Sequence, residues 1–264
     1  MIERKPRLEG KVAIVTGAGS RGPGIGNGKA TAILFAREGA KVLLIDRVLE
    51  RVQETADIIS SEGGEASVVT ADVTKLEDCQ EVVNAVVKVY GRLDVLHNNV
   101  GIDSKGSVVD LDIDEWDRVM EVNLKSIMLT SRFAIPQMVA EGGGVIINIS
   151  STSAVRPRGL TAYTASKGGV ISLTRAMAAS HAKDNIRVNC IMPGTVFTPM
   201  VAEGMTDEVR EKRKLDVPLQ TEGTAWDIAW AAVYLASDEA RWVTGIVLPV
   251  DGGLLLTRRD LPQT

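Results

Sequence analysis

The chain has 264 residues, 45% hydrophobic and 24% charged, and its 30 basic and 34 acidic side chains give a net charge of −4. No Lys/Arg block suggests a nucleic-acid face, and the longest apolar runs are far shorter than the roughly 20 residues of a membrane span. The charged N-terminal segment lacks the apolar stretch of a signal peptide, and Cys79 and Cys190 stand alone, which favours a reducing compartment. We therefore expect a cytoplasmic protein with no nucleic-acid or membrane partner. We also expect no metal, because no His/Cys cluster has metal-ligand spacing.

Apolar strand-like runs alternate with amphipathic stretches of helical length along the chain. The expected strands cover residues 12–16, 42–45, 67–71, 95–97, 145–149, 187–191 and 246–250. The expected helices cover residues 25–38, 48–62, 75–90, 114–140, 162–182 and 225–236. Continuous apolar strands are buried on both faces, so this alternation predicts an α/β fold: a doubly wound, mostly parallel seven-stranded sheet with helices on both faces. No linker or repeat divides residues 1–264, which we interpret as a single domain.

A glycine-rich turn at residues 17–26 lies between the first strand and the first helix. Glycines let the backbone approach a pyrophosphate closely, and the N-terminus of the next helix favours its negative charge. The literal G-x-G-x-x-G begins at Gly17, but Pro23 fits no helix interior and favours a helix that opens around residues 24–26. Asp46 ends the second strand, where an acid can bind the ribose hydroxyls of NAD and would repel the 2′-phosphate of NADP. The pattern predicts a Rossmann-type fold that binds NAD.

Tyr163 and Lys167 are four residues apart in an expected helix, so their side chains share one face about one turn apart. A tyrosine has a free pKa of about 10, and a nearby positive charge favours its phenolate, which makes it a plausible general base. Ser151 lies upstream, behind the apolar strand at 145–149. With the glycine turn, these residues indicate oxidation of an alcohol, or reduction of a ketone, by a nicotinamide cofactor.

Several other features leave alternatives open. The irregular stretch at 195–223 follows the carboxyl end of a strand, where such sheets bind ligands, and is either a partly helical substrate lid or an ordinary surface excursion. Arg156 and Arg158 could bind an acidic substrate, stay solvated or pair across a subunit contact. We interpret His97 as a hydrogen-bonded core histidine.

Further short motifs carry a family resemblance. They are, in chain order, Thr16-Gly17 with Gly24-Ile25-Gly26, similar to T-G-x-x-x-G-x-G with three extra residues; Asp72-Val73; Asn98-Asn99-Val100-Gly101; Asn123; Asn148-Ile149-Ser150-Ser151; Tyr163-x-x-x-Lys167; Pro193-Gly194; and Val250-Asp251-Gly252-Gly253. In this order they resemble the short-chain dehydrogenase/reductase family across nearly the whole chain. Three features depart from the family pattern: the glycine turn contains three extra residues, Val100 replaces the usual alanine, and the gap between Ser151 and Tyr163 is one residue shorter than the commonest spacing. The shorter gap leaves Ser150 and Ser153 as competitors for the serine role.

The resemblance implies roles for individual residues. Tyr163 would be the general base, Lys167 would hold the cofactor ribose and depress the Tyr163 pKa, and Ser151 would bind the substrate oxygen. Asn123 would support a water that connects Lys167 to solvent. The implied cofactor-binding residues are Gly17, Gly19, Ser20, Arg21, Gly24, Ile25, Gly26, Asp46, Arg47, Asp72, Val73, Asn99, Val100, Gly101, Val122, Tyr163, Lys167, Pro193, Gly194, Val196 and Thr198. The expected substrate-binding residues are Ser151, Ser153, Tyr163, Thr195 and Met200.

The leading hypothesis is an NAD(H)-dependent oxidoreductase that interconverts a secondary alcohol, or a hydroxyl-bearing ring, and its ketone. An NADPH-dependent ketoreductase acting on a 3-oxoacyl thioester is the alternative, because Arg21 or Arg47 could bind a phosphate. A non-catalytic dinucleotide-sensing protein is a remote third, since it would be expected to have lost Ser151, Tyr163 or Lys167. The resemblance also implies a homotetramer.

Overall fold

The structure, a computed structural model, describes residues 5–202 and 204–257. Seven strands form one sheet in the order β3-β2-β1-β4-β5-β6-β9, and every neighbouring pair is parallel. The strands are β1 (Val12–Thr16), β2 (Lys41–Asp46), β3 (Ala66–Thr70), β4 (Val95–Asn98), β5 (Gly144–Ile149), β6 (Ile186–Pro193) and β9 (Val247–Val250). The predicted seven-stranded parallel sheet is therefore confirmed.

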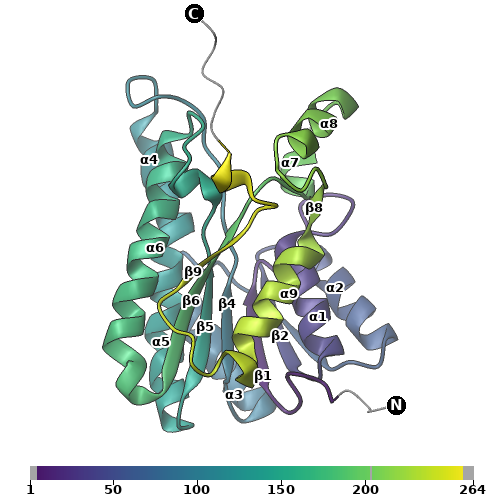
Figure 1. Ribbon diagram of the computed structural model, residues 1–264. Coiled ribbons are helices and arrows are strands. Elements are labelled where there is room, and N and C mark those ends of the chain that lie inside the picture. The colour runs from purple at the N-terminus through teal and green to yellow at the C-terminus, as the bar shows by residue number, and fades with distance from the viewer. Residues whose placement is uncertain (1–4, 203, 258–264) are drawn as a thin grey trace, which may run out of the picture.

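Helices cover both faces of the sheet (Figure 1). One face carries α1 (Asn27–Arg37), α2 (Leu49–Ser61) and α9 (Ala225–Ala236), and the other carries α3 (Leu76–Tyr90), α5 (Ser126–Ala140) and α6 (Thr161–His181). In β2, Val42 and Leu44 belong to the first core, whereas Leu43 and Ile45 belong to the second. A strand buried on both faces needs apolar residues at successive positions, which explains why the strands read as continuous apolar runs.

The helix expected at 114–140 is interrupted. It consists of α4 (Ile113–Met120), a π-helical turn (Glu121–Lys125) and α5. Asp112 caps α4 by accepting hydrogen bonds from the backbone of Asp114 and Glu115. A π turn adds one residue to a helical turn and is frequent at functional sites. Here it contains Asn123.

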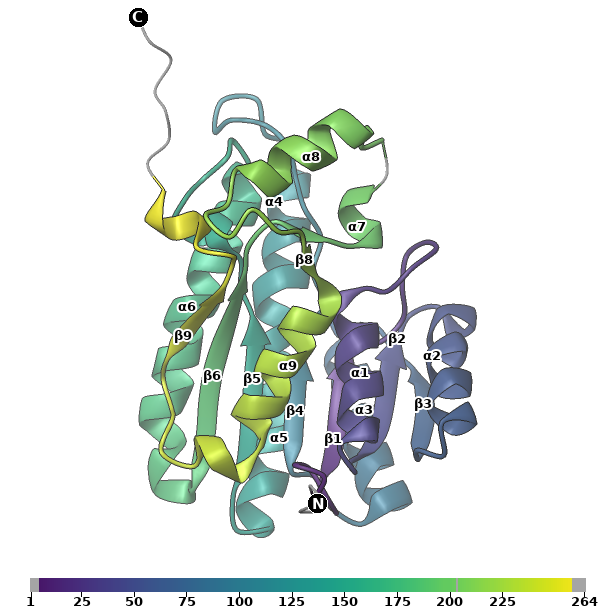
Figure 2. The same ribbon diagram turned by 45° about the vertical axis from the view of Figure 1, so that its right-hand side comes forward.

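Residues 195–223 leave the sheet after β6 and lead into α9. The segment contains β7 (Val196–Phe197), α7 (Pro199–Ala202) and α8 (Asp207–Leu215), and it ends in β8 (Gly223–Thr224). The two short strands pair in parallel, so the two ends of the excursion are joined to each other. Figure 2 shows α7 and α8 above the carboxyl ends of the sheet strands. The excursion is thus partly helical, as the sequence predicts.

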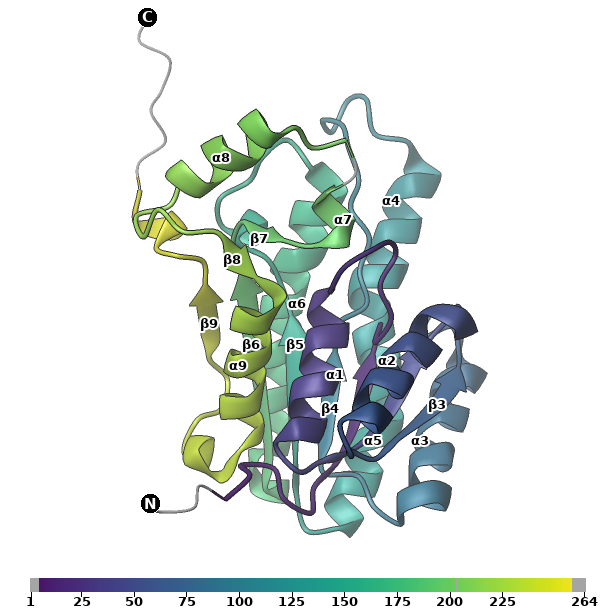
Figure 3. The same cartoon turned by 90° about the vertical axis from the view of Figure 1, so that its right-hand side faces the viewer.

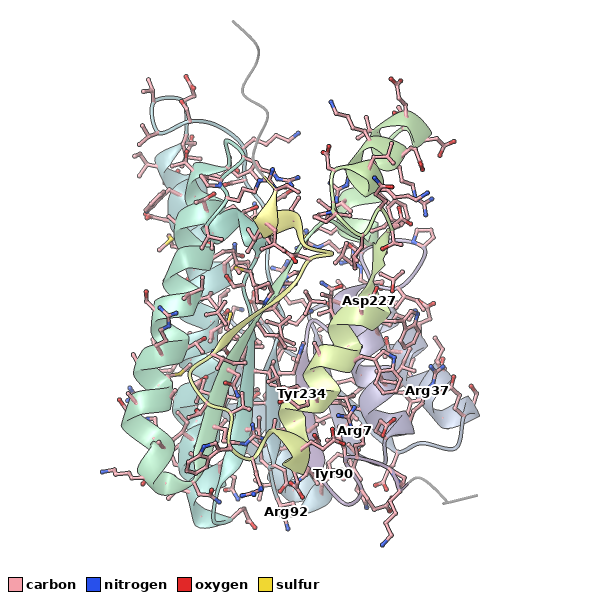
Figure 4. All side chains as sticks on the ribbon, viewed as in Figure 1. Arg7, Arg37, Tyr90, Arg92, Asp227 and Tyr234 are labelled. Carbon is pink, nitrogen blue, oxygen red and sulfur yellow. The ribbon has the colours of Figure 1, made fainter. Side chains whose placement is uncertain are left out.

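The last helix begins where this excursion ends. Asp227 accepts hydrogen bonds from the backbone nitrogen and the hydroxyl of Thr224 at 2.7 and 2.8 Å, in a capping box that fixes the start of α9. Asp227 lies at the end of α9 near the excursion, and Tyr234 lies farther down the helix (Figure 4). Short 3₁₀ turns complete the fold at Thr152–Ala154, Ala182–Asp184, Asp238–Ala240 and Leu254–Leu256.

No helix in the described ranges is long and apolar enough to cross a membrane. Among those residues there is also no cluster of His, Cys, Asp and Glu side chains that could hold a metal ion.

Candidate active site

One pocket lies at the carboxyl ends of the strands and gathers most of the predicted residues. Of those, its walls contain Gly17, Gly19, Ser20, Arg21, Gly26, Asp46, Arg47, Asp72, Val73, Asn99, Val100, Gly101, Val122, Ser151, Tyr163, Lys167, Pro193, Gly194, Val196, Thr198 and Met200. These residues come from segments spread over most of the chain. The fold thus brings the glycine turn, Asp46 and the Ser-Tyr-Lys set to a single cavity.

Other predicted residues are not part of the pocket wall. They are Gly24, Ile25, Asn123, Ser153 and Thr195. The wall also contains residues that the sequence did not suggest, among them Asn27, Gly28, Val48, Arg51, Thr74, Ile102, Pro199 and Val201. Gly28 could have been found, because Gly26 and Gly28 repeat the G-x-G spacing at a helix start.

The two sides of the glycine turn are joined by a hydrogen bond between Ser20 and Gly26. The backbone nitrogen of Gly26 donates to Ser20 Oγ at 3.0 Å, and α1 begins at Asn27 with Gly26 as its N-cap. A Cβ on Gly28 would lie 2.1 Å from the Gly17 carbonyl oxygen, so only glycine allows helix and strand to approach this closely. The helix-start glycines are therefore Gly26 and Gly28, rather than Gly24 and Gly26. The turn contains five extra residues, Arg21–Ile25, rather than the expected three.

The carboxylate of Asp46 is held by the backbone on both sides. Its oxygens accept hydrogen bonds from Gly19 N and Val48 N, each at 3.2 Å. Arg47 is drawn toward Asp72, with 3.6 Å between its guanidinium nitrogen and the carboxylate oxygen. Burial raises the pKa of Asp72, but hydrogen bonds from Thr74 and the charge of Arg47 outweigh it and leave a lowered value. At this end of the pocket, the backbone therefore orients the Asp46 carboxylate, and Asp72 restrains the Arg47 guanidinium.

Ser151 is distinguished from the neighbouring serines by its contacts. The Ser150 hydroxyl is buried and donates to the Lys167 carbonyl oxygen at 2.7 Å. Ser150 and Ser151 both line the pocket, but it is Ser151 that hydrogen-bonds Tyr163. Ser151 Oγ also accepts a hydrogen bond from Ser153 N at 3.1 Å, at the start of a short 3₁₀ turn. Ser153 lies outside the wall. The geometry therefore favours Ser151 as the serine that faces a bound molecule.

Tyr163 lies in the first turn of α6, and Lys167 follows one turn later. Burial raises the pKa of Tyr163, although a hydrogen bond with Ser151 opposes this effect in part. Burial lowers the pKa of Lys167 to about 8, and its Nζ donates to the Ile149 carbonyl oxygen at 2.9 Å. Burial therefore stabilises the neutral form of both side chains.

Asn123 joins the elements around Lys167. Its amide exchanges two 2.8 Å hydrogen bonds with the backbone of Ile102 and donates to Ser166 Oγ at 3.0 Å. A Cβ on Gly101 would lie 3.3 Å from Lys167 Nζ and 3.5 Å from Asn123 Oδ1, so the three residues meet around one point. The Asn123 side chain therefore fixes the end of the β4 segment against α6.

Two other side chains differ from expectation. Arg156 donates to the Leu254 carbonyl oxygen and to Thr257 Oγ1, so it binds the C-terminal segment of its own chain. His97 is fully buried, as expected, but neither ring nitrogen has a hydrogen-bond partner among the described residues. The predicted hydrogen-bonded histidine is therefore wrong. The ring instead packs edge-on against Phe35, with 6.1 Å between ring centres.

Comparison with known proteins agrees with this fold. A family model described as enoyl-(acyl carrier protein) reductase matches residues 22–255. The 3-oxoacyl-[acyl-carrier-protein] reductase FabG of Thermotoga maritima is 39% identical over 251 residues, covering 95% of this chain and 100% of that protein. The 7α-hydroxysteroid dehydrogenase of Clostridium sardiniense is also 39% identical, with 95% of each chain covered. A solved short-chain dehydrogenase/reductase structure from Burkholderia xenovorans has a TM-score of 0.92 and 41% identity, covering 96% of this chain and 100% of that one. The chain therefore belongs to the short-chain dehydrogenase/reductase family of oxidoreductases.

Proposed function

We propose that the protein is an NAD(H)-dependent oxidoreductase that interconverts a secondary alcohol, or a hydroxyl-bearing ring, and the corresponding ketone. The observation that carries this proposal is the single pocket that contains the glycine turn, Asp46, Ser151, Tyr163 and Lys167. Hydride transfer requires a dinucleotide and a proton acceptor side by side, and this pocket has residues suited to both.

The turn and helix start fit a pyrophosphate. Asn27 and Gly28 at the N-terminus of α1 line the pocket, where backbone N–H groups favour an anion. A Cβ at Gly19 would lie 2.6 Å from the Cβ of Arg51 and 2.9 Å from an Asp46 oxygen, so the backbone passes close to the acid that would bind the ribose. Dinucleotide binding is the simplest use of this cradle.

Each catalytic side chain has a defined role in the proposed mechanism. A bound nicotinamide would supply the acceptor for the carbinol hydride. Tyr163 accepts the hydroxyl proton, so the alcohol loses a proton and a hydride and becomes the ketone. Ser151 donates a hydrogen bond to the reacting oxygen and keeps it within reach of Tyr163. Lys167 binds the ribose hydroxyls and, as a cation, favours the phenolate.

The alternative is an NADPH-dependent reductase of 3-oxoacyl thioesters. Two observations favour it: FabG of Thermotoga maritima is similar over the whole chain, and Arg47 and Arg51 line the adenosine end of the pocket. Asp46 argues for NAD because its oriented carboxylate would repel a 2′-phosphate. The third hypothesis is a non-catalytic dinucleotide sensor. Such a protein would not need Ser151, Tyr163 and Lys167 together in one cavity.

A panel of secondary alcohols, hydroxysteroids and 3-oxoacyl thioesters, assayed with NAD(H) and NADP(H), tests the proposal. We expect NAD-dependent oxidation of at least one alcohol, and a loss of 10²-fold or more in Tyr163→Phe. Tyr90→Phe is a matched control, because Tyr90 bonds Ser67 at 2.9 Å and lies at the opposite end of the sheet (Figure 4). Turnover only with NADPH and a thioester would establish the alternative, and dinucleotide binding without turnover of any compound would favour the sensor.

A further inference from the structure

The five extra residues of the glycine turn form a projection of their own. The hydrogen bond from Gly26 N to Ser20 Oγ closes the base at 3.0 Å, and residues 21–25 extend beyond it. Figure 3 shows this part of the chain rising beyond the start of α1 toward α7. Since the base is already closed, residues 21–25 are not needed to connect β1 to α1. Their position calls for a separate explanation.

The first residue of the projection reaches across the pocket. Arg21 Nη2 donates to the Gly101 carbonyl oxygen at 2.8 Å, and both residues belong to the pocket wall. Gly101 follows β4, and a Cβ there would lie 3.3 Å from Lys167 Nζ. The arginine thus joins the glycine turn to the wall beside the proposed catalytic lysine.

The other side of the projection lies close to the excursion above the sheet. A Cβ on Gly24 would lie 3.6 Å from Cγ of Pro199, the first residue of α7. Pro199 itself lines the pocket. The projection is therefore hydrogen-bonded to the end of the β4 segment and lies near α7.

We propose that Arg21–Ile25 form a strap across the dinucleotide pocket, which closes over the pyrophosphate of a bound cofactor and slows its release. The inference rests on the proposed function, because it takes the pocket to hold a dinucleotide. A guanidinium has the planar, multi-donor geometry that suits phosphate oxygens, and it stays charged at any working pH. Arg21 can therefore exchange the Gly101 carbonyl for the more strongly attracting pyrophosphate.

The order of the strands distinguishes binding of the pyrophosphate by Arg21 from recognition of a 2′-phosphate. Asp46 ends β2, whereas Gly101 follows β4, and these strands flank β1 on opposite sides. A 2′-phosphate would lie beside Asp46, where the ribose hydroxyls are expected to bind. The Arg21 head group bonds Gly101, on the other side of β1 from Asp46.

The decisive measurement is cofactor release, followed by NADH fluorescence in stopped-flow displacement, with dissociation constants from titration. Arg21→Ala should release NADH about tenfold faster than wild type and bind it about tenfold more weakly. Deletion of residues 21–25, which joins Ser20 directly to Gly26 and restores the family spacing, should have a similar effect. Arg92→Ala is the control, because Arg92 pairs with Asp94 at the far end of β4 (Figure 4).

The possible outcomes are distinct. Unchanged NADH release in both Arg21→Ala and the deletion would overturn the strap. Weakened binding of NADPH alone would overturn it too, because it would assign Arg21 to a 2′-phosphate. A wild-type protein that binds neither dinucleotide would instead refute the proposed function. If the deletion variant does not fold, the release rate of Arg21→Ala decides the question.

Discussion

Lys167 Nζ lies 5.8 Å from the centre of the Tyr163 ring and donates its hydrogen bond to the Ile149 carbonyl oxygen. Burial raises the pKa of Tyr163. In the proposed function, the phenolate needs additional positive charge, which the oxidised nicotinamide ring would provide beside Lys167. We therefore expect activation of the base to depend on cofactor binding.

This coupling predicts the pH dependence of alcohol oxidation. With saturating NAD, kcat/KM should rise through one ionisation, roughly one to three units below the free tyrosine value, because the nicotinamide cation, and Lys167 below its own pKa of about 8, favour the phenolate. Lys167→Met should move that ionisation to higher pH. The measurement is kcat/KM across pH for wild type and variant. An ionisation that stays in place would limit Lys167 to holding the ribose.

Cofactor preference should depend on Asp46. Backbone N–H groups orient its carboxylate, so we expect wild type to prefer NAD strongly over NADP. Asp46→Ser should reduce the ratio of the two kcat/KM values about tenfold or more, because the repulsion disappears with the charge. Asp57→Ser, in an exposed Gln53–Asp57 pair on α2, is the control and should keep the ratio. Equal kcat/KM for both cofactors in wild type would contradict this assignment.

The predicted substrate lid at residues 195–223 should depend on one arginine. None of the nine residues of α8 is buried, yet Arg210 binds both carboxylate oxygens of Glu222 and stacks on Phe197, with 3.9 Å from its Cζ to the ring centre. Arg210→Ala should loosen α8 and raise the KM for substrate several-fold, with kcat nearly unchanged. Hydrogen exchange of residues 207–215, compared with the Lys212→Ala control, measures the loosening. Unaltered exchange would mean that other contacts hold the helix.

Acid should destabilise the fold through His97. Burial lowers the pKa of His97 from 6.5 to about 3, so between these values the unfolded chain binds the proton and the native state does not. Stability is then fully present above pH 6.5 and falls as pH approaches 3, with an upper limit of roughly 5 kcal/mol. His97→Leu should flatten the Tm profile between pH 4 and 7, whereas His181→Gln should leave it steep. If the Tm of His97→Leu fell with pH as steeply as that of wild type, protonation of His97 would not be the cause of the acid destabilisation.

The protein should form a homotetramer. A groove between α4, α5 and α6 is lined by Leu124, Met128 and Leu173 together with charged residues such as Arg118 and Glu121. Apolar side chains bordered by charges suit a self-complementary contact about a two-fold axis. Light scattering should give four times the chain mass of 28.3 kDa, and Met128→Glu should reduce it. A monomer at micromolar concentration would reject the prediction.

The sheet could be predicted from the sequence because burial on both faces leaves unbroken apolar runs. The positions of Tyr163 and Lys167 on one helical face followed from their spacing, and α6 confirms it. The glycine turn was misaligned because several glycines offered equivalent spacings. The Ser20–Gly26 hydrogen bond and the close approach of Gly28 to Gly17 distinguish the projecting residues from the cradle.

Tertiary contacts between distant residues were beyond sequence reasoning. The sequence position of Arg156, next to the serine segment, is compatible with an anionic partner, but the structure places the C-terminal segment against it. His97 was expected to find a hydrogen bond, as most buried polar groups do. The position of its ring against Phe35 depends on how α1 packs over the sheet, which no local pattern encodes.

The π turn at Glu121–Lys125 sets the rotational phase between two halves of a long helical segment. Since an α-helix turns about 100° per residue, removal of one residue there would rotate α4 by that angle relative to α5. Asn123 would then leave the Ile102 backbone, and the outer face of α4 with Arg118 would turn away from the groove beside α5. A single deletion in this turn would therefore change both the packing around Lys167 and the outer surface of the molecule. The two are linked through the same helical segment, so one cannot change its helical register without the other.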